Sequence, residues 1–183
     1  PKAAFLTGGS DAIARAYTRR YNVRVAPIHN VFDPLVDDLE NFRAPDESLS
    51  MYWFSQTIGP GRGLEDVIRS SGLAAVPLVL HLRGSISTEY LAELVDIARR
   101  EAATLDVVHH APGMPDDMVA LSAEYDIGIA TEQSRPYNRA ICLTNKAFVY
   151  LAAGLAVALT DTEGQHPLVE ELGANAVSFA PGD

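Results

Sequence analysis

From residue 51 onward, short apolar runs alternate with segments of helical periodicity, and this alternation most constrains the fold. Six such runs are present, at residues 51–55, 76–84, 105–110, 126–131, 155–160 and 176–180. Strands that are joined through helices pair in parallel, and helices then cover both faces of the sheet. The alternation therefore predicts an α/β domain with a Rossmann-like, doubly wound parallel sheet. Such sheets bind ligands at the carboxyl ends of their strands.

A smaller unit precedes this sheet. Within residues 1–36, two apolar runs flank a helical segment that Ser10 or Asp11 can cap. The acidic, proline-containing segment that follows has weak periodicity, so we expect residues 37–48 to be a linker with at most one helical turn. The Rossmann-like domain then spans residues 49–183, and we expect the chain to be a piece of a longer protein.

Charge and cysteine content narrow the partners and the compartment. The formal net charge of −10 disfavours nucleic acid or an anionic membrane surface as the main partner, but a local basic pocket can still hold a small anion. Cys142 is the only cysteine, which excludes an internal disulfide and leads us to expect a reducing, cytoplasmic location. No apolar run reaches the length of a membrane span.

A glycine-rich turn, "GPGRG" at residues 59–63, follows the first strand of the sheet. Glycines let the backbone approach a ligand closely, and free amides at a helix start favour anions. Arg62 stands at that helix start and could contact a phosphate. The turn lacks the dinucleotide and phosphate-loop patterns, so the local sequence fits a tight connection with a surface arginine equally well.

A second helix start carries a lysine. Thr144 or Asn145 can cap the helix that follows the loop after strand 126–131, and the amides of residues 145–147 would point out of the carboxyl edge of the sheet. Lys146 opposes the helix dipole at this position, which is easier to understand if an anion binds there. The alternative is a lysine that extends into solvent.

The remaining polar candidates give weaker signals. Glu132 ends a strand at the same edge and could bind sugar hydroxyls or be a solvated loop residue. His109 and His110 are adjacent in a strand, so they face opposite sides of the sheet, and they have no partners at metal-ligand spacing. We therefore expect no metal site. Cys142 has no indicated base nearby and is expected to be a packing residue.

Taken together, these segments resemble the GT-B glycosyltransferases. "LTNKAFVYLAAGLAV" is similar to the "pNKlfEYlaaGlPV" segment of that family, and "FSQTIGPGRGLEDVI" is similar to its "vGrl...KGld.li" segment. "MPDDMVALSAEYDIGIATE" and "FLTGGSDAIARAYTRRYNVRVAPIHNVFD" resemble two further segments, so the resemblance covers nearly the whole chain. It implies a carboxyl-terminal, donor-binding domain that is preceded by the last strand–helix–strand of the amino-terminal domain.

The resemblance implies an activity and its partners. The expected reaction is retaining transfer of a sugar from a nucleotide-diphosphate donor, such as a UDP- or GDP-sugar, in polysaccharide biosynthesis. The sugar or lipid-linked acceptor would be bound by the missing amino-terminal domain, so we expect this piece alone to be inactive. The parent could associate with a membrane to reach such an acceptor. No cofactor other than the donor substrate is expected.

The resemblance also implies roles for individual residues. Arg62 and Lys146 would hold the donor diphosphate, and Glu132 would lie on the sugar side. Further donor contacts would come from the glycine turn and the second helix start, at Gln56, Gly59, Gly61, Thr144, Asn145 and Ala147.

Three positions depart from the family pattern. Val149 stands where a glutamate usually binds the donor ribose, Ala156 replaces a proline, and Gln56 replaces an arginine. Because valine cannot accept a hydrogen bond, the donor base and sugar stay open. Two alternatives follow, namely a non-catalytic GT-B-like binding or scaffold domain and a nucleotide-sugar epimerase-like enzyme. An epimerase needs histidine and carboxylate groups that reach the sugar, and the sequence does not place them.

Overall fold

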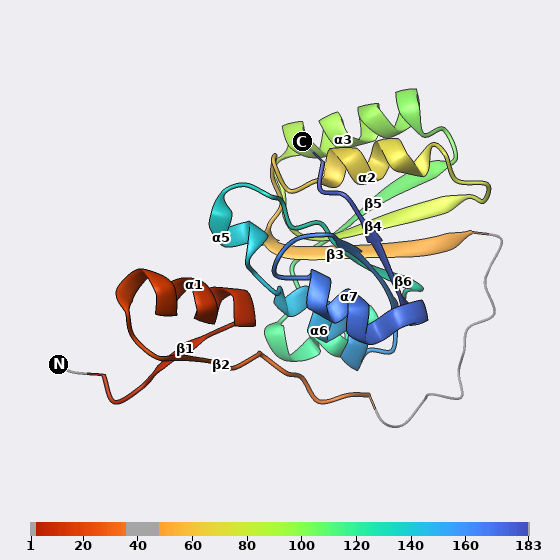
Figure 1. Cartoon of the computed structure of the whole chain (residues 1–183). Helices are drawn as coiled ribbons and strands as arrows, with labels where there is room; N and C mark the ends of the chain where they lie inside the picture. Colours follow the sequence, from red (N-terminus) through yellow and green to blue (C-terminus); the bar gives the residue numbers. More distant parts are fainter. Residues whose placement is uncertain (1–2, 36–47, 183) are drawn as a thin grey trace.

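A computed structural model describes residues 3–35 and 48–182, and its main feature is a six-stranded sheet (Figure 1). All paired strands are parallel, in the order β5-β4-β3-β6-β7-β8. Each of the six predicted runs forms one strand, which confirms the expected fold class. The strands are β3 (Leu49–Thr57), β4 (Leu78–Ser85), β5 (Leu105–His110), β6 (Ile127–Ala130), β7 (Ala156–Thr160) and β8 (Ala176–Phe179).

Helices cover both faces of this sheet. Figure 1 shows α2 (Leu64–Ser71) and α3 (Thr88–Glu101) on one face, with α6 (Asn145–Ala152) and α7 (His166–Leu172) on the other. The shorter elements complete the connections, as η1 (Pro115–Asp117), α4 (Met118–Ser122), α5 (Tyr137–Ala140) and η2 (Gly173–Asn175).

The alternation of side chains along β3 separates two cores. Met51 and Trp53 belong to the core beneath α2 and α3, whereas Tyr52 belongs to the core that α4, α6 and α7 cover. Trp53 and Tyr52 are both almost fully buried, as expected for a central strand of a sheet with helices on both faces. The two cores therefore lie on opposite faces of β3, and side chains pack against the strand on both faces.

Side-chain caps start α1 and α3. The Ser10 hydroxyl accepts a hydrogen bond from the Ile13 amide at 3.1 Å, and the Ser87 hydroxyl accepts one from the Tyr90 amide at 3.2 Å. Each cap satisfies an amide that has no partner inside its helix. Of the two predicted caps for the first helix, Ser10 is therefore the one used.

The first part of the chain is a small parallel unit that lies beside α6. It comprises β1 (Leu6–Gly8), α1 (Asp11–Tyr21) and β2 (Val25–Pro27). The buried Ser10 hydroxyl also donates to the carbonyl of Ile141 at 2.6 Å, which joins this unit to the loop before α6. Of the predicted linker, residues 37–47 lie outside the described residues, so the division into 1–36, 37–48 and 49–183 stays a prediction.

Candidate functional site

The predicted site residues gather where the direction of the sheet topology changes. From β3 the chain continues outward to β4 and β5, and from β6 it continues in the opposite direction to β7 and β8. The loops after the neighbouring strands β3 and β6 therefore lead to opposite sides at the carboxyl edge, the place where doubly wound sheets have their ligand-binding crevice. Gly59, Gly61 and Arg62 follow β3, and Glu132 follows β6.

The start of α6 lies at the same edge. Thr144 is the N-cap, and its hydroxyl accepts a hydrogen bond from the Lys146 amide at 3.4 Å. The Ala147 amide donates to the carbonyl of Thr144 at 3.2 Å, so two of the three amides expected to be free take part in the cap. Asn145 accepts from the side chain of Asn30 at 2.9 Å, which brings the loop after β2 to the helix start.

Lys146 is buried rather than extended into solvent. Only 8% of the residue is exposed, and its ammonium nitrogen lies 3.0 Å from Glu132 Oε1. The same nitrogen lies 5.2 Å from the centroid of the Trp53 ring, close enough for a cation–π contact. A buried charge requires a partner, and here a carboxylate and an aromatic face provide it. The interpretation of Lys146 as a solvated residue is therefore wrong.

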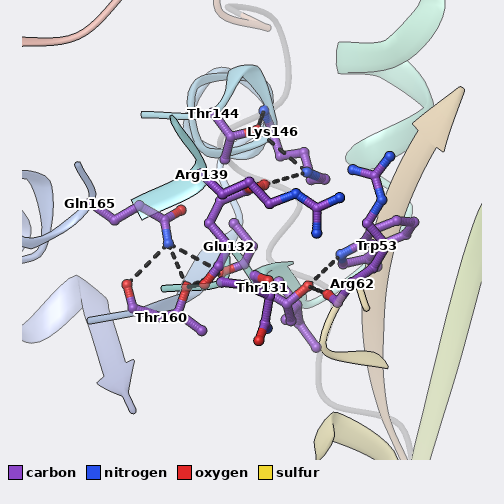
Figure 2. A network of polar contacts seen from close by, with 12 residues as sticks. Trp53, Arg62, Thr131, Glu132, Arg139, Thr144, Lys146, Thr160 and Gln165 are labelled. Carbon is purple, nitrogen blue, oxygen red and sulfur yellow. Dashed lines mark hydrogen bonds and ion pairs between the residues drawn. The ribbon is translucent and has the colours of Figure 1, made fainter. Parts of the chain in front are cut away.

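Glu132 is held in place through its backbone. Its carbonyl accepts a hydrogen bond from the Thr160 hydroxyl at 2.6 Å, and Thr160 in turn accepts from the side chain of Gln165 at 2.8 Å. Gln165 is fully buried and also donates to the carbonyl of Thr160 at 3.0 Å. Figure 2 shows this network behind Glu132, on the side away from Trp53. With its side chain only 12% exposed, Glu132 is thus not a solvated loop glutamate.

The glycine-rich turn is tied to the loop after β6 through its carbonyl groups. The Thr131 hydroxyl donates to the carbonyl of Arg62, and the Arg139 guanidinium donates to the carbonyl of Gly61. Gly61 and Gly63 have positive φ angles of 70° and 76°, a conformation that favours glycine.

Three basic side chains therefore lie at this edge of the sheet, one of them paired with Glu132. In Figure 2 the charged ends of Arg62, Arg139 and Lys146 lie on the same side of the Trp53–Thr131 pair. No carboxylate within residues 3–35 and 48–182 forms an ion pair with Arg62 or Arg139, and Glu132 pairs with Lys146 alone. A chain with a net charge of −10 thus concentrates positive charge at this point, which favours a small anionic ligand.

The other predicted candidates lie in different settings. Gln56 is exposed at the end of β3, and Val149 is 2% exposed, within the core beneath α6. Val149 therefore contributes packing and no ligand contact. The two histidines face opposite sides of β5, since His109 Nε2 lies 2.8 Å from the carbonyl of Gly84 and His110 Nε2 lies 2.9 Å from His81 Nδ1.

Cys142 has the properties of a packing residue. Burial raises the pKa of its thiol, and the nearby Glu132 carboxylate adds to this effect. The thiol therefore stays protonated at neutral pH, whereas a nucleophilic cysteine needs a lowered pKa. In the described part of the chain, no group of three or more His, Cys, Asp or Glu side chains is arranged to hold a metal ion.

A cavity of about 130 Å³ lies between α1, α6 and α7, away from the cationic crevice. Its lining includes His29, Phe148 and Glu163 but none of the three cations. Phe148 follows Lys146 by two positions and so points to another side of α6. Among the described residues, no helix combines the length and the apolar character that a bilayer crossing requires.

Sequence reasoning missed four residues of this site: Trp53, Thr131, Arg139 and Thr160. From the sequence, Trp53 is expected to be a core residue of an apolar strand, and Thr131 stands at the end of a second apolar strand. Arg139 lies in α5, within a stretch that the sequence analysis treats as a loop, and no local pattern marks it. Only the pairing of β3 with β6 brings these side chains to the glycine turn.

Known structures resemble this chain over nearly its full length. A glycosyltransferase from Rickettsia africae is 14% identical with a TM-score of 0.69, covering 98% of this chain and 50% of its own. Anabaena HepE, solved with UDP and glucose, is 20% identical with a TM-score of 0.68, covering 99% and 50%. Sucrose-phosphate synthase from Thermosynechococcus elongatus is 15% identical with a TM-score of 0.70, covering 100% and 46%.

The likeness lies in the fold, since no family model and no curated protein sequence matches the chain. The chain spans about half the length of these structures. Its parallel sheet, with the crevice between β3 and β6, agrees with the resemblance that the sequence motifs suggested. The chain has the fold of the GT-B glycosyltransferases.

Proposed function

We propose that this chain carries the donor-binding half of a glycosyltransferase, which moves a sugar from a nucleotide-diphosphate donor to an acceptor. One observation carries the proposal, namely the gathering of Arg62, Arg139 and Lys146 at the crevice between β3 and β6. A diphosphate is a small, doubly charged anion that fits such a cluster. The UDP complex of the similar Anabaena structure supports a nucleotide donor.

The proposed reaction needs little covalent participation by the protein. The bond between the anomeric carbon and the diphosphate oxygen breaks, and its electron pair stays on the leaving nucleotide diphosphate. The acceptor hydroxyl forms the new bond to the anomeric carbon and passes its proton to the leaving diphosphate oxygen. Negative charge therefore grows on the diphosphate, where Arg62 and Lys146 stabilise it. The glycine turn that carries Arg62 also contains Gly59 and Gly61, and the helix start that carries Lys146 also contains Asn145 and Ala147.

Glu132 is proposed to have two partners in succession. Without donor its carboxylate neutralises Lys146 at 3.0 Å. When the diphosphate takes over Lys146, Glu132 is released to accept hydrogen bonds from hydroxyl groups of the donor sugar. The retaining outcome, the acceptor and a cytoplasmic location belong to the same proposal, and the acceptor would be bound by a part of the protein outside this chain. We therefore expect this piece alone to bind donor without transferring sugar.

A second candidate function is a GT-B-like binding or scaffold domain without catalysis. The burial of Val149 favours it, because the family position that holds the ribose here packs inside the core. At this position no carboxylate would then bind the ribose, and other groups would have to hold it. The two candidates differ in whether a nucleotide binds at all.

Calorimetric titration of the chain with UDP, GDP and ADP tests the proposal. The site variant is Lys146→Met combined with Glu132→Gln, so that no buried carboxylate is left without its partner. The control is Arg100→Ala on the exposed side of α3. We expect one nucleotide to bind, with a Kd raised at least about tenfold by the double variant relative to Glu132→Gln alone and unchanged by the control. Equal binding by Glu132→Gln and by the double variant would refute the site.

A further inference from the structure

One buried side chain connects the two basic residues that the proposed donor site depends on. Trp53 is 1% exposed and lies on β3. The face of its ring lies 5.2 Å from the Lys146 ammonium, and its indole nitrogen donates to the Thr131 hydroxyl at 2.9 Å. Thr131 in turn donates to the carbonyl of Arg62 (Figure 2). The ring face therefore contacts one cation, and the ring edge reaches the turn that carries the other.

Hydrogen-bond chemistry fixes the direction of this chain of contacts. An indole N–H can only donate, so Thr131 accepts from Trp53. The hydroxyl has a single proton, which it gives to the carbonyl of Arg62. The three groups thus form a one-way relay, and neither bond can reverse.

The relay orients the backbone of the glycine turn. In a trans peptide unit the carbonyl and the following amide point in opposite directions. When Thr131 holds the carbonyl of Arg62, the amide of Gly63 points away from Thr131. Arg139 acts in the same way on the carbonyl of Gly61 and so on the amide of Arg62. The two carbonyl contacts therefore fix the orientation of both peptide units in the turn that carries Arg62.

We propose that Trp53 and Thr131 are positioning residues that set Arg62 and Lys146 at one diphosphate. The inference rests on the proposed donor site and goes beyond it, because neither residue touches the ligand. The ring face holds the Lys146 ammonium against Glu132, and the ring edge holds the turn through Thr131. Loss of the relay should therefore reduce affinity for the diphosphate while all three cations remain.

The test uses the whole chain with UDP and with inorganic pyrophosphate. Thr131→Val keeps the volume and removes the hydroxyl, whereas Thr131→Ser keeps the hydroxyl. We expect Thr131→Val to raise the Kd for both ligands about tenfold or more, and Thr131→Ser to stay within about threefold of the wild type. Should Thr131→Val not fold, Trp53→Phe takes its place, since it retains a ring over Lys146 and removes the indole N–H.

A double-variant cycle separates positioning from a loss of packing. If the relay acts through Arg62, then Arg62→Ala should weaken binding about tenfold in the wild type but less than about threefold in Thr131→Val. Trp53 is the only tryptophan in the chain, so its emission provides a second readout. UDP should change that emission in the wild type, and the change should be smaller in Thr131→Val. A merely structural role of Thr131 would leave the Arg62→Ala effect unaltered.

The outcomes separate the two proposals. If the wild type binds neither UDP nor pyrophosphate, then the donor site and the positioning inference both fail. If the wild type binds and the Lys146→Met/Glu132→Gln variant is weakened, but Thr131→Val and Trp53→Phe bind as tightly as the wild type, then only the positioning inference is overturned.

Discussion

The ammonium nitrogen of Lys146 lies 3.0 Å from Glu132 Oε1, and the two side chains are only 10% and 12% exposed. These residues are 14 positions apart and come from the loop after β6 and the start of α6. A buried ion pair contributes little net stability when intact, because desolvation offsets the attraction, but removing one partner is costly. An anion that binds at the crevice therefore changes the charge balance of the Lys146–Glu132 pair.

Removing Lys146 alone should destabilise the chain strongly. Lys146→Met leaves the Glu132 carboxylate buried without its partner, and we expect a loss of about 3–5 kcal/mol in the free energy of unfolding. Urea titration followed by circular dichroism measures it. The matched control is Glu101→Gln, which breaks an exposed pair with Arg69 and should cost less than about 1 kcal/mol. Equal losses for both variants would contradict the burial of the Lys146–Glu132 pair.

Removing the carboxylate should strengthen anion binding. Glu132→Gln frees Lys146 from its internal partner and removes a negative charge from the crevice. We expect the Kd for pyrophosphate to fall by about threefold to tenfold, because near charges interact strongly outside bulk water. Calorimetry at two salt concentrations measures it, with Glu101→Gln as the control of equal charge change. A higher Kd in Glu132→Gln would show that the carboxylate supports the ligand rather than competing with it.

Substitution of two neighbouring glycines should have unequal effects. Both have positive φ, which costs about 1–2 kcal/mol for another residue. A Cβ at Gly63 would also displace the flexible end of Gln133 and lie 3.1 Å from Thr131 Cβ and 3.3 Å from the Thr131 carbonyl oxygen, whereas a Cβ at Gly61 meets nothing within 4 Å. Gly63→Ala should therefore lower both the melting temperature and UDP affinity more than Gly61→Ala does. A calorimetric scan and a titration of each variant decide this.

Acidification should weaken the fold through His110. Burial, with the neighbouring Arg83 and His109, lowers the pKa of His110 below its usual value of 6.5. Below pH 6.5 the unfolded chain binds a proton there that the folded chain does not, so stability is present above that pH and is lost as the pH falls. Replacing the ring with His110→Gln should flatten the decline in urea midpoint between pH 7 and pH 5.

His166 provides the control of opposite sign for that experiment. Its hydrogen bond to Asp161, with Glu170 nearby, raises the pKa of His166, so its contribution is present at low pH and is lost as the pH rises. His166→Gln should therefore steepen the decline on acidification. A steeper decline in His110→Gln would contradict the lowered pKa of His110.

Local patterns predicted the elements well because their causes are local. The strands follow from apolar runs of strand length, and the cap at Thr144 follows from a hydroxyl residue just ahead of an apolar helical stretch. Gly61 and Gly63 marked a turn that needs positive φ. The burial of Lys146 could not be predicted from local patterns, because an isolated lysine at a helix start is usually solvated.

The α/β class, the six strands and the two helix starts can be predicted from the sequence, since these features depend on neighbouring residues. How these parts meet depends on the assembled sheet. The order that sets β3 beside β6 brings Trp53 within 2.9 Å of Thr131, 78 positions away, and places Lys146 over the same ring. Periodicity encodes which face of a strand is buried but not which strand lies next to it, so the site emerges only when the sheet is assembled.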